Sequence, residues 1–470
     1  AMKDRYKTQL GRFAAAGQDH VLGFWNQLDD AQRARLLDQL EAVPLELVAE
    51  LGSQLKDGAA HAAAPELAPP DIFPIARSSQ QEAQARQARE RGLELLAAGR
   101  VGYVLVAGGQ GSRLGLDGPK GMFPVGPISG QTLFEIHAAR LEAARERWGA
   151  PVSWYVMTSP ANHAATQAYF AECDHFGLGE ENIFLFQQAM LPALDLTGRV
   201  LLADPGNLFL APNGHGGTLE AMASSGALEH AAGRGIEVFS YFQVDNPLVR
   251  PADPLFIGLH AEAGAAMSTK VIPKRDAAEK VGVIGLVDGR FGCIEYSDLS
   301  PELLEARDEG GALLYRAGNT AVHVIDLDFI RSLTDGGLSL PWHQAKKRIP
   351  TVDRAGARVE VDGVKFETFI FDALAASERS VTLEVDRALE FSPVKNAEGS
   401  DSPATTRADL CGLFAGWARE CGCVLPDADG AGNLPIEVDP RRAEDLDEFR
   451  ARLCEGLAES GGEAPGHLYR

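Results

Sequence analysis

From Val101 onward, short runs of β-branched and aromatic residues alternate with helical patterns, and this alternation constrains the fold most strongly. The strand-like runs read YVLVA, SWYVMT, NIFLF, EVFSYFQV and AVHVIDL in chain order. Helical patterns separate most of them, as in residues 132–148, where Thr132 and Glu135 have the spacing of a capping box. Such alternation predicts an α/β domain with a mostly parallel sheet. Ligands of these sheets bind at the carboxyl ends of the strands.

The sequence on either side of this region has a different composition. Its first 60 residues are rich in Ala, Leu, Gln and charged residues, which predicts helices. A proline-rich stretch, residues 61–78, precedes another helical run that reaches Gly99. We therefore expect a helical N-terminal region over residues 1–98, a central domain over 99–390, and a small C-terminal domain over 391–470.

Composition limits the partners. The chain carries 44 Lys and Arg against 66 Asp and Glu, a net charge of −22, which argues against nucleic acid as a partner. A small anionic ligand is compatible with this charge, because a few local cations can dominate inside a cleft. The sequence has no uncharged apolar run of membrane-spanning length and no apolar N-terminal stretch typical of a secretory signal. We expect a cytoplasmic protein without membrane contact; its oligomeric state is not predicted.

A glycine-rich loop, AGGQGSRLGLDGPKG, follows the first strand-like run. Such a loop is typical of phosphate binding, because peptide N–H groups approach oxygens closely where no Cβ intervenes. The Rossmann spacing fails, since Leu114 stands where the third glycine is needed, and the Gly-Lys-Ser/Thr of a P-loop is absent. With these two motifs excluded, the loop is a glycine-rich turn that carries Arg113 and Lys120. These two side chains could reach the β- and γ-phosphates of a nucleoside triphosphate. The alternative is a tight turn with two solvated cations.

Other candidate residues have ordinary structural interpretations when they are taken alone, and for some of them a binding role is open as well. Asp245 ends a strand-like run, where it could hold Mg²⁺ against a triphosphate or serve as a turn residue. Gln187 and Gln188 could bind a base edge or cap local backbone. Glu295 is typical of a charge on a strand surface, and Lys395 of an exposed lysine.

Sequence segments from the glycine loop to Lys395 follow one another in a characteristic order. They read GGQGSRLG with PKGMFPVG, TLFEIHAAR, WYVMTS, FQQAMLPAL, VDNPLVRPADPLFIG, VGVIG, IEYSDLS, AGNTAVH, KFETFIFDAL and EFSPVKNAEG. In this order they resemble the sugar nucleotidyltransferases, and more specifically the eukaryotic-type UDP-N-acetylhexosamine pyrophosphorylases of the UDP-glucose pyrophosphorylase superfamily. The resemblance covers about residues 100 to 410 and is weaker in the N-terminal region.

The resemblance implies a Rossmann-like nucleotidyltransferase domain with a mixed, mostly parallel sheet, and it assigns residues to four roles. These are catalysis at the phosphates for Arg113, Lys120 and Lys395; nucleotide binding for Gly108, Gly109, Gly111, Gln188 and Gly214; sugar binding for His215, Gly282, Glu295 and Asn319; and Mg²⁺ binding for Asp245.

The reaction it implies joins UTP to a hexose 1-phosphate and gives a UDP-sugar and pyrophosphate. A sugar-phosphate oxygen attacks the α-phosphorus in line, so catalysis consists of positioning and charge neutralisation. The alternative from a different class is a UDP-sugar-binding protein without catalysis.

The second glycine turn bears on the sugar. It reads Gly214-His215-Gly216-Gly217, whereas N-acetylhexosamine enzymes commonly have Asn at the second position and the UDP-glucose branch has His. The first glycine loop, Glu295 and Asn319 resemble the N-acetylhexosamine branch. We therefore favour N-acetylglucosamine 1-phosphate as the substrate. The alternatives are glucose 1-phosphate and a broad specificity for sugar 1-phosphates.

Overall fold

The computed structural model describes residues 2–57, 65–422, 436–454 and 468–469. The chain divides into two compact units. Unit 1 contains Ala1–Pro65, Gln188–Gly217 and Leu340–Phe369, and unit 2 contains Glu66–Gln187, Thr218–Ser339 and Ile370–Arg470. The predicted division at residues 98 and 390 stays a prediction.

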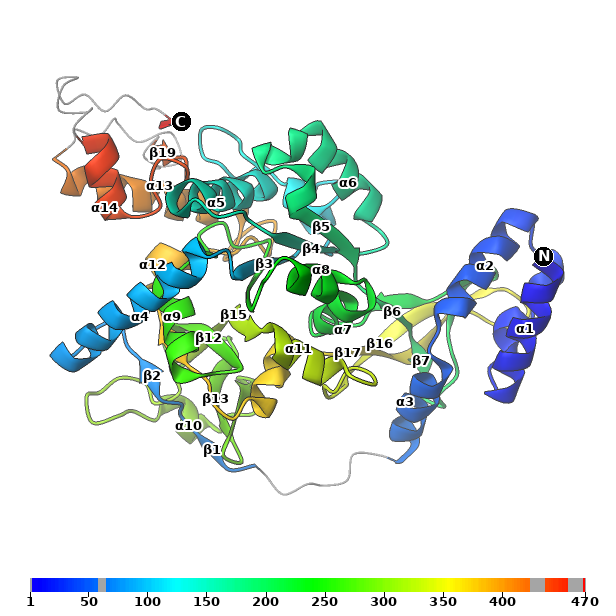
Figure 1. Cartoon of the computed structure of the whole chain (residues 1–470). Coiled ribbons are helices and arrows are strands. Elements are labelled where there is room, and N and C mark those ends of the chain that lie inside the picture. The colour runs from blue at the N-terminus through cyan, green and yellow to red at the C-terminus, as the bar shows by residue number, and fades with distance from the viewer. Residues whose placement is uncertain (1, 58–64, 423–435, 455–467, 470) are drawn as a thin grey trace. The chain divides into compact units, whose positions relative to one another are not determined.

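An 11-stranded sheet forms the centre of unit 2 within the described residues (Figure 1). Its main path runs β2-β18-β12-β15-β11-β3-β4-β5. All neighbours on this path pair in parallel except at β15, which is antiparallel to both β11 and β12. The strands of the path are β2 (Ile72–Phe73), β3 (Val101–Val106), β4 (Trp154–Thr158), β5 (Ile183–Gln187), β11 (Val238–Gln243), β12 (Met267–Pro273), β15 (Ala317–Asp326) and β18 (Thr382–Glu384). The predicted mixed, mostly parallel sheet is confirmed.

A smaller antiparallel extension joins β15. It consists of β1 (Leu67–Ala68), β13 (Val283–Val287) and β14 (Arg290–Ile294). Val283 of β13 pairs with Gly318 of β15, which links this extension to the main sheet.

Most helices of unit 2 begin at a side-chain cap, although α6, α8 and α11 do not. The Thr132 hydroxyl accepts a hydrogen bond from the backbone N–H of Glu135, and the Glu135 carboxylate accepts one from the backbone N–H of Thr132, so the capping box predicted from their spacing is present. The helices are α4 (Ser79–Ala97), α5 (Leu133–Trp148), α6 (His163–Glu172), α7 (Gly217–Ser224, whose first residue belongs to unit 1), α8 (Ala227–Gly233), α9 (Pro254–Ala263), α10 (Pro301–Glu305), α11 (Leu327–Thr334), α12 (Arg387–Glu390), α13 (Pro403–Glu420) and α14 (Leu446–Phe449).

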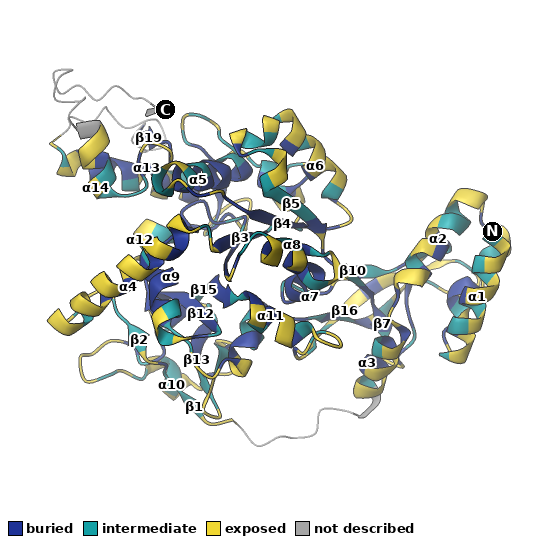
Figure 2. Ribbon diagram, in the orientation of Figure 1, coloured by how far each residue is buried: buried dark blue, intermediate teal, exposed yellow. Residues whose placement is uncertain are grey.

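The core of unit 2 lies between its sheet and its helices (Figure 2). The central strands β3, β4 and β11 are buried almost throughout, as expected of parallel strands covered on both faces. Trp154 is fully buried and packs with Phe170 at 5.3 Å between ring centroids. This buried sheet gives the loops at its carboxyl edge a rigid base.

Within the described residues, unit 1 combines three α-helices with five short strands and two ten-residue strands, β16 and β17. Its elements are α1 (Met2–Ala15), α2 (Asp30–Ala42), α3 (Leu45–Asp57), β6 (Met190–Pro192), β7 (Leu194–Asp195), β8 (Leu202–Asp204), β9 (Asn207–Leu208), β10 (Leu210–Pro212), β16 (His343–Val352) and β17 (Arg358–Glu367). Asp29 forms the capping box of α2. Residues from all three chain segments, such as Phe13, Leu194 and Phe366, share one buried core. Within the described part of the chain, we find no helix with the length and apolar composition needed to span a bilayer.

Candidate active site

The glycine loop leaves the carboxyl end of β3 and closes on itself. Lys120 N–H donates to Gly109 O at 3.0 Å, and Gly111 N–H donates to Gly118 O at 2.8 Å. Gly115 has a φ of 77°, in the left-handed region that favours glycine. Gly109 is exposed, Gly108 is half-buried, and a Cβ at Gly109 would have no heavy atom within 4 Å. The loop therefore presents open backbone, which suits close approach by a ligand.

The two cations of this loop have different surroundings. Arg113 lies on a short 3₁₀ turn, Ser112–Leu114, and is exposed. Lys120 is largely buried, with 17% of its side chain exposed, and its Nζ lies 3.4 Å from Oδ2 of Asp245. Arg113 is thus available to an incoming anion, whereas Lys120 already neighbours a carboxylate.

Asp245 reaches Lys120 because their strands are neighbours. β11 pairs with β3 in parallel, with Gln243 opposite Val106, so the segments that follow both strands leave the same edge of the sheet. Val244 N–H donates to Val106 O at 3.1 Å and continues this pairing. The sequence predicted a carboxylate at this edge, and the structure places it beside a predicted phosphate-binding cation.

Lys395 belongs to the same neighbourhood through the backbone. Val394 N–H donates to the carbonyl oxygen of Asp245 at 2.8 Å. The Lys395 side chain is exposed, and its Nζ lies 5.8 Å from the centre of the Phe391 ring. The glycine loop, Asp245 and the segment that ends at Lys395 therefore form one group, although they come from three distant parts of the chain.

Two buried side chains that the sequence did not reveal support this group. Asn162 donates to Ala107 O at 2.9 Å and to Gly109 O at 3.1 Å, which fixes the start of the loop. His137 lies 3.0 Å from Val244 O through Nε2, so this nitrogen carries the proton. Burial lowers the pKa of His137 to about 4 and keeps its ring neutral. Both residues hold backbone beside the predicted site.

Three residues predicted to bind the sugar gather around Cys293, a free cysteine of β14. Asn319 donates its backbone N–H to Gly282 O at 2.9 Å, and its side-chain amide lies 3.8 Å from the Cys293 sulfur. A Cβ at Gly282 would lie 2.8 Å from this sulfur and 3.5 Å from an oxygen of Glu295. Burial, and secondarily the charge of Glu295, raises the pKa of the Cys293 thiol to about 12, so it is not a thiolate at neutral pH. No motif in the sequence pointed to Cys293.

The remaining predicted residues lie in unit 1. Gln188 is buried, and its amide donates to Gly214 O at 2.7 Å. Gly214 has a φ of 83°, and Thr368 packs directly against it, because Gly216 N–H donates to Thr368 O at 2.9 Å. The His215 ring lies 5.4 Å from that of Phe369. The second glycine turn is thus fixed by Gln188 on one side and by the segment after β17 on the other.

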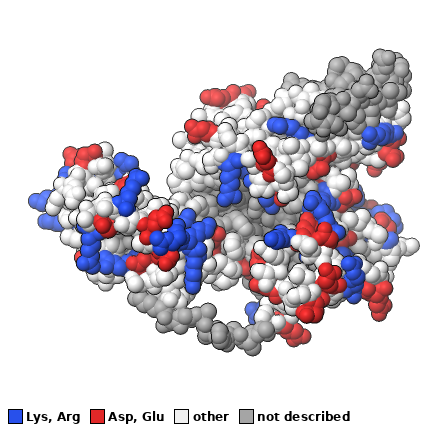
Figure 3. All heavy atoms as spheres, turned by 180° about the vertical axis from the view of Figure 1, so that it is seen from behind, with Lys and Arg blue, Asp and Glu red and all other residues white. Residues whose placement is uncertain are grey.

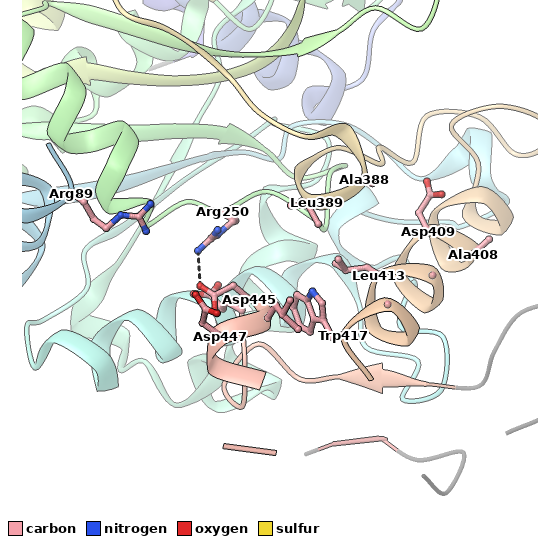
Figure 4. A pocket seen from close by; sticks show the side chains of 14 residues that line it. Arg89, Arg250, Ala388, Leu389, Ala408, Asp409, Leu413, Trp417, Asp445 and Asp447 are labelled. Atoms are coloured by element: carbon pink, nitrogen blue, oxygen red, sulfur yellow. Dashed lines mark hydrogen bonds and ion pairs between the residues drawn. The ribbon is translucent and has the colours of Figure 1, made fainter. Parts of the chain in front are cut away.

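A cavity of about 710 Å³ lies elsewhere in unit 2, among α4, α12, α13 and α14 (Figure 4). Leu389, Leu413 and Trp417 give it an apolar lining, and Arg250 pairs with Asp445 across it at 3.4 Å. As the structure describes it, the predicted substrate-binding residues do not line this cavity.

Charge on the surface is mixed. On the face seen in Figure 3, basic and acidic side chains are interspersed. Because salt screens charges beyond about 8 Å, the field at the glycine loop depends on nearby charges, among them Arg113, Asp117, Lys120 and Asp245, rather than on the net charge of −22.

Comparison with known proteins agrees with this architecture. A family model described as UTP–glucose-1-phosphate uridylyltransferase matches residues 62–410. The chain is 37% identical to the UDP-N-acetylhexosamine pyrophosphorylase-like protein 1 of Homo sapiens, over 95% of this chain and 93% of the relative. It is 36% identical to the UDP-N-acetylglucosamine pyrophosphorylase of Saccharomyces cerevisiae, over 94% and 96%. A crystal structure of the Trypanosoma brucei uridine diphosphate N-acetylglucosamine pyrophosphorylase, in complex with an inhibitor, superposes with a TM-score of 0.84, at 26% identity, over 100% of this chain and 99% of that one.

The parallel sheet with a glycine loop at its carboxyl edge defines an α/β nucleotide-binding protein of the nucleotidyltransferase class. More specifically, the chain belongs to the UTP–glucose-1-phosphate uridylyltransferase family. The predicted family, fold and enzyme class are confirmed, while the roles of the individual residues stay predictions.

Proposed function

We propose that the protein joins UTP to N-acetylglucosamine 1-phosphate and releases UDP-N-acetylglucosamine and pyrophosphate. The observation that carries this proposal is the grouping of Lys120, Asp245 and the Lys395 segment beside an open glycine loop. The names of the relatives support the acetylated sugar.

In the proposed reaction, an anionic oxygen of the sugar phosphate attacks the α-phosphorus of UTP. The bond to the bridging oxygen breaks on the opposite side, and pyrophosphate leaves with the electron pair. Because the attacking oxygen is already ionised, no general base is required. The open backbone at Gly109 lets the triphosphate approach, and Arg113 and Lys120 would bind its β- and γ-phosphates. Lys395 would stabilise the charge on the transferring phosphate.

Asp245 is the residue that would hold Mg²⁺. The donor fits this ion: it is a partly exposed carboxylate on a loop fixed by backbone hydrogen bonds, and Mg²⁺ commonly takes one or two carboxylates together with phosphate oxygens. The bound ion would neutralise phosphate charge. Two unit charges 4 Å apart interact by about 4 kcal/mol at an effective dielectric constant near 20.

The other predicted residues would select the base and the sugar. Gln188 offers a donor and an acceptor suited to uracil, next to the Gly214 backbone. Gly282, Glu295 and Asn319 would supply the sugar with a backbone N–H, a carboxylate and an amide. His215 resembles the glucose branch, whereas the relatives named above act on N-acetylated sugars by name. A pocket that pairs with an acetamido group rejects a sugar without one, because polar groups are left unpaired.

Pyrophosphate release measured with the full chain, UTP and Mg²⁺ tests the proposal. N-acetylglucosamine 1-phosphate, N-acetylgalactosamine 1-phosphate and glucose 1-phosphate are compared in parallel, and we expect the first to give the highest kcat/KM. A higher value for glucose 1-phosphate would overturn the choice of sugar. Binding of UDP-sugar without any pyrophosphate release would overturn the enzymatic proposal.

A further inference from the structure

Asn246, the residue after Asp245, is almost fully buried, with 4% of its surface exposed. Both the NH₂ group and the oxygen of its side-chain amide form hydrogen bonds. The Nδ2 group donates to Glu390 O at 2.8 Å, and Oδ1 accepts from Ser392 N–H at 3.0 Å and from Leu248 N–H at 3.3 Å. One side chain therefore joins its own loop to residues 390–392.

A second bond runs beside these. Val394 N–H donates to the Asp245 carbonyl oxygen at 2.8 Å. Residues 245–246 and 390–394 are thus joined along their length, and Lys395 follows at once. We name this set of hydrogen bonds the Asn246 clasp.

The segment held by the clasp is also fixed from its other side. Ser392 Oγ donates to Asp409 of α13 at 2.6 Å, and Thr406 Oγ1 donates to Ser392 O at 3.2 Å. The loop that carries Asn246 has a further anchor of its own, because Arg140 donates to Pro247 O at 2.8 Å. Both segments, residues 245–247 and 390–394, are therefore anchored, and the clasp sets the position of one segment relative to the other.

We propose that Asn246 is a positioning residue, which fixes Lys395 relative to Asp245 during phosphoryl transfer; this inference rests on the proposed function. Asparagine suits the task because its planar amide carries a donor and an acceptor together. Alanine would leave the carbonyl of Glu390 and the N–H of Ser392 without their partner. Of the clasp, only the Val394 bond to the Asp245 carbonyl would remain, so Lys395 would be positioned less tightly beside the reacting phosphates, although Asn246 itself touches no substrate.

The first test compares Asn246→Ala with the unsubstituted chain. We expect kcat to fall roughly 100-fold, as for a misplacement of about 1 Å, while KM for UTP changes less than about threefold. Hydrogen exchange of the Ser392 and Val394 amides should accelerate at least about tenfold, because their acceptors are lost or displaced. The matched control is Ser78→Ala, which removes the N-cap of α4 in the same unit and should lower the melting temperature without changing kcat.

A double-mutant cycle with Lys395→Ala separates positioning from a general loss of structure. If Asn246 acts by placing Lys395, Asn246→Ala should lower kcat less than about threefold in the Lys395→Ala background. An undiminished loss in that background, or an unchanged kcat in the single variant, would overturn the inference. If the alanine variant does not fold, Asn246→Asp replaces it in the cycle, since it keeps the acceptor oxygen and puts a charged oxygen in place of the donor that faces the Glu390 carbonyl. A parent chain without turnover would refute the proposed function instead, and the exchange of Ser392 and Val394 would still test the clasp.

Discussion

Gly214→Ala should damage the second glycine turn far more than an ordinary glycine substitution would. Gly214 has a φ of 83°, and a Cβ there would lie 2.7 Å from Thr368 N and closer still to Thr368 O. A normal contact between carbon and oxygen is about 3.3 Å or longer. The carbonyl oxygen of Thr368 would therefore have to move by about 1 Å.

The expected cost follows from the bonds that this movement breaks. Thr368 donates its N–H to Asn213 O at 2.8 Å, accepts from Gly216 N–H at 2.9 Å, and donates Oγ1 to Asn213 O at 3.0 Å. Losing two or three such bonds costs about 2–3 kcal/mol, and the left-handed backbone costs a further 1–2 kcal/mol, roughly. The total is about 3–5 kcal/mol.

Gly356→Ala is the matched control in the same unit. Gly356 has a φ of 85°, but the nearest atom to a Cβ is in ordinary contact at 3.4 Å, on the Phe24 side chain. We expect this variant to lose only the backbone contribution, about 1–2 kcal/mol. Urea unfolding followed by fluorescence measures both losses, and calorimetry with UTP should show weakened binding only for Gly214→Ala, since Gln188 bonds to the Gly214 carbonyl. Equal losses of stability in the two variants would refute the argument from Thr368.

Four further predictions concern the proposed site and its support. Asp245→Asn should raise the Mg²⁺ concentration for half-maximal activity, because a neutral amide is a poorer ligand; an unchanged Mg²⁺ titration would contradict this. Lys120→Ala should weaken UTP binding by roughly tenfold or more and UMP binding little, through lost charged hydrogen bonds, and equal losses in calorimetry would be the opposing result. Lys395→Ala should lower kcat by about 10²–10³, whereas near-normal turnover of the purified variant would remove its assignment. Burial lowers the pKa of His137 to about 4 in the folded chain, whereas in the unfolded chain the ring takes up a proton near pH 6.5. The free energy of unfolding therefore decreases as the pH falls from about 6.5 toward 4, by about 2–3 kcal/mol at pH 4.5. In urea unfolding, the decrease in the free energy of unfolding between pH 7 and pH 4.5 should be smaller for His137→Gln than for the unsubstituted chain. An equal decrease would exclude His137 as the cause.

Local pattern was sufficient to predict β3, β4, β5, β11 and β15 of unit 2, but not β12, β13, β14 or β18. The runs YVLVA and SWYVMT became β3 and β4, and the spacing of Thr132 and Glu135 gave the start of α5. The direction of β15 could not be read in this way. Its composition suits either orientation, and its antiparallel pairing depends on β11 and β12, which lie far away in sequence.

The residues of the candidate site were likewise predicted only in part. The resemblance assigned Lys120 to the phosphates and Asp245 to Mg²⁺, and the structure places Lys120 Nζ 3.4 Å from Asp245 Oδ2. Their roles stay predictions. Asn162, Asn246 and Cys293 were not predicted. These residues contact backbone or side chains that are distant in sequence, and no periodicity or motif predicts such contacts.

Unit 1 is built from three separate segments, and this has a consequence for how it forms during synthesis. Phe13 emerges from the ribosome early, but Val364 and Phe366 of the same core are made more than 300 residues later. At about 5–20 residues per second, this interval lasts on the order of 15–60 seconds. Throughout it the N-terminal helices carry apolar faces that have no finished core to cover them. A nascent chain of this kind is a natural client for chaperones, and a fragment that stops before residue 369 would carry the same exposed faces permanently.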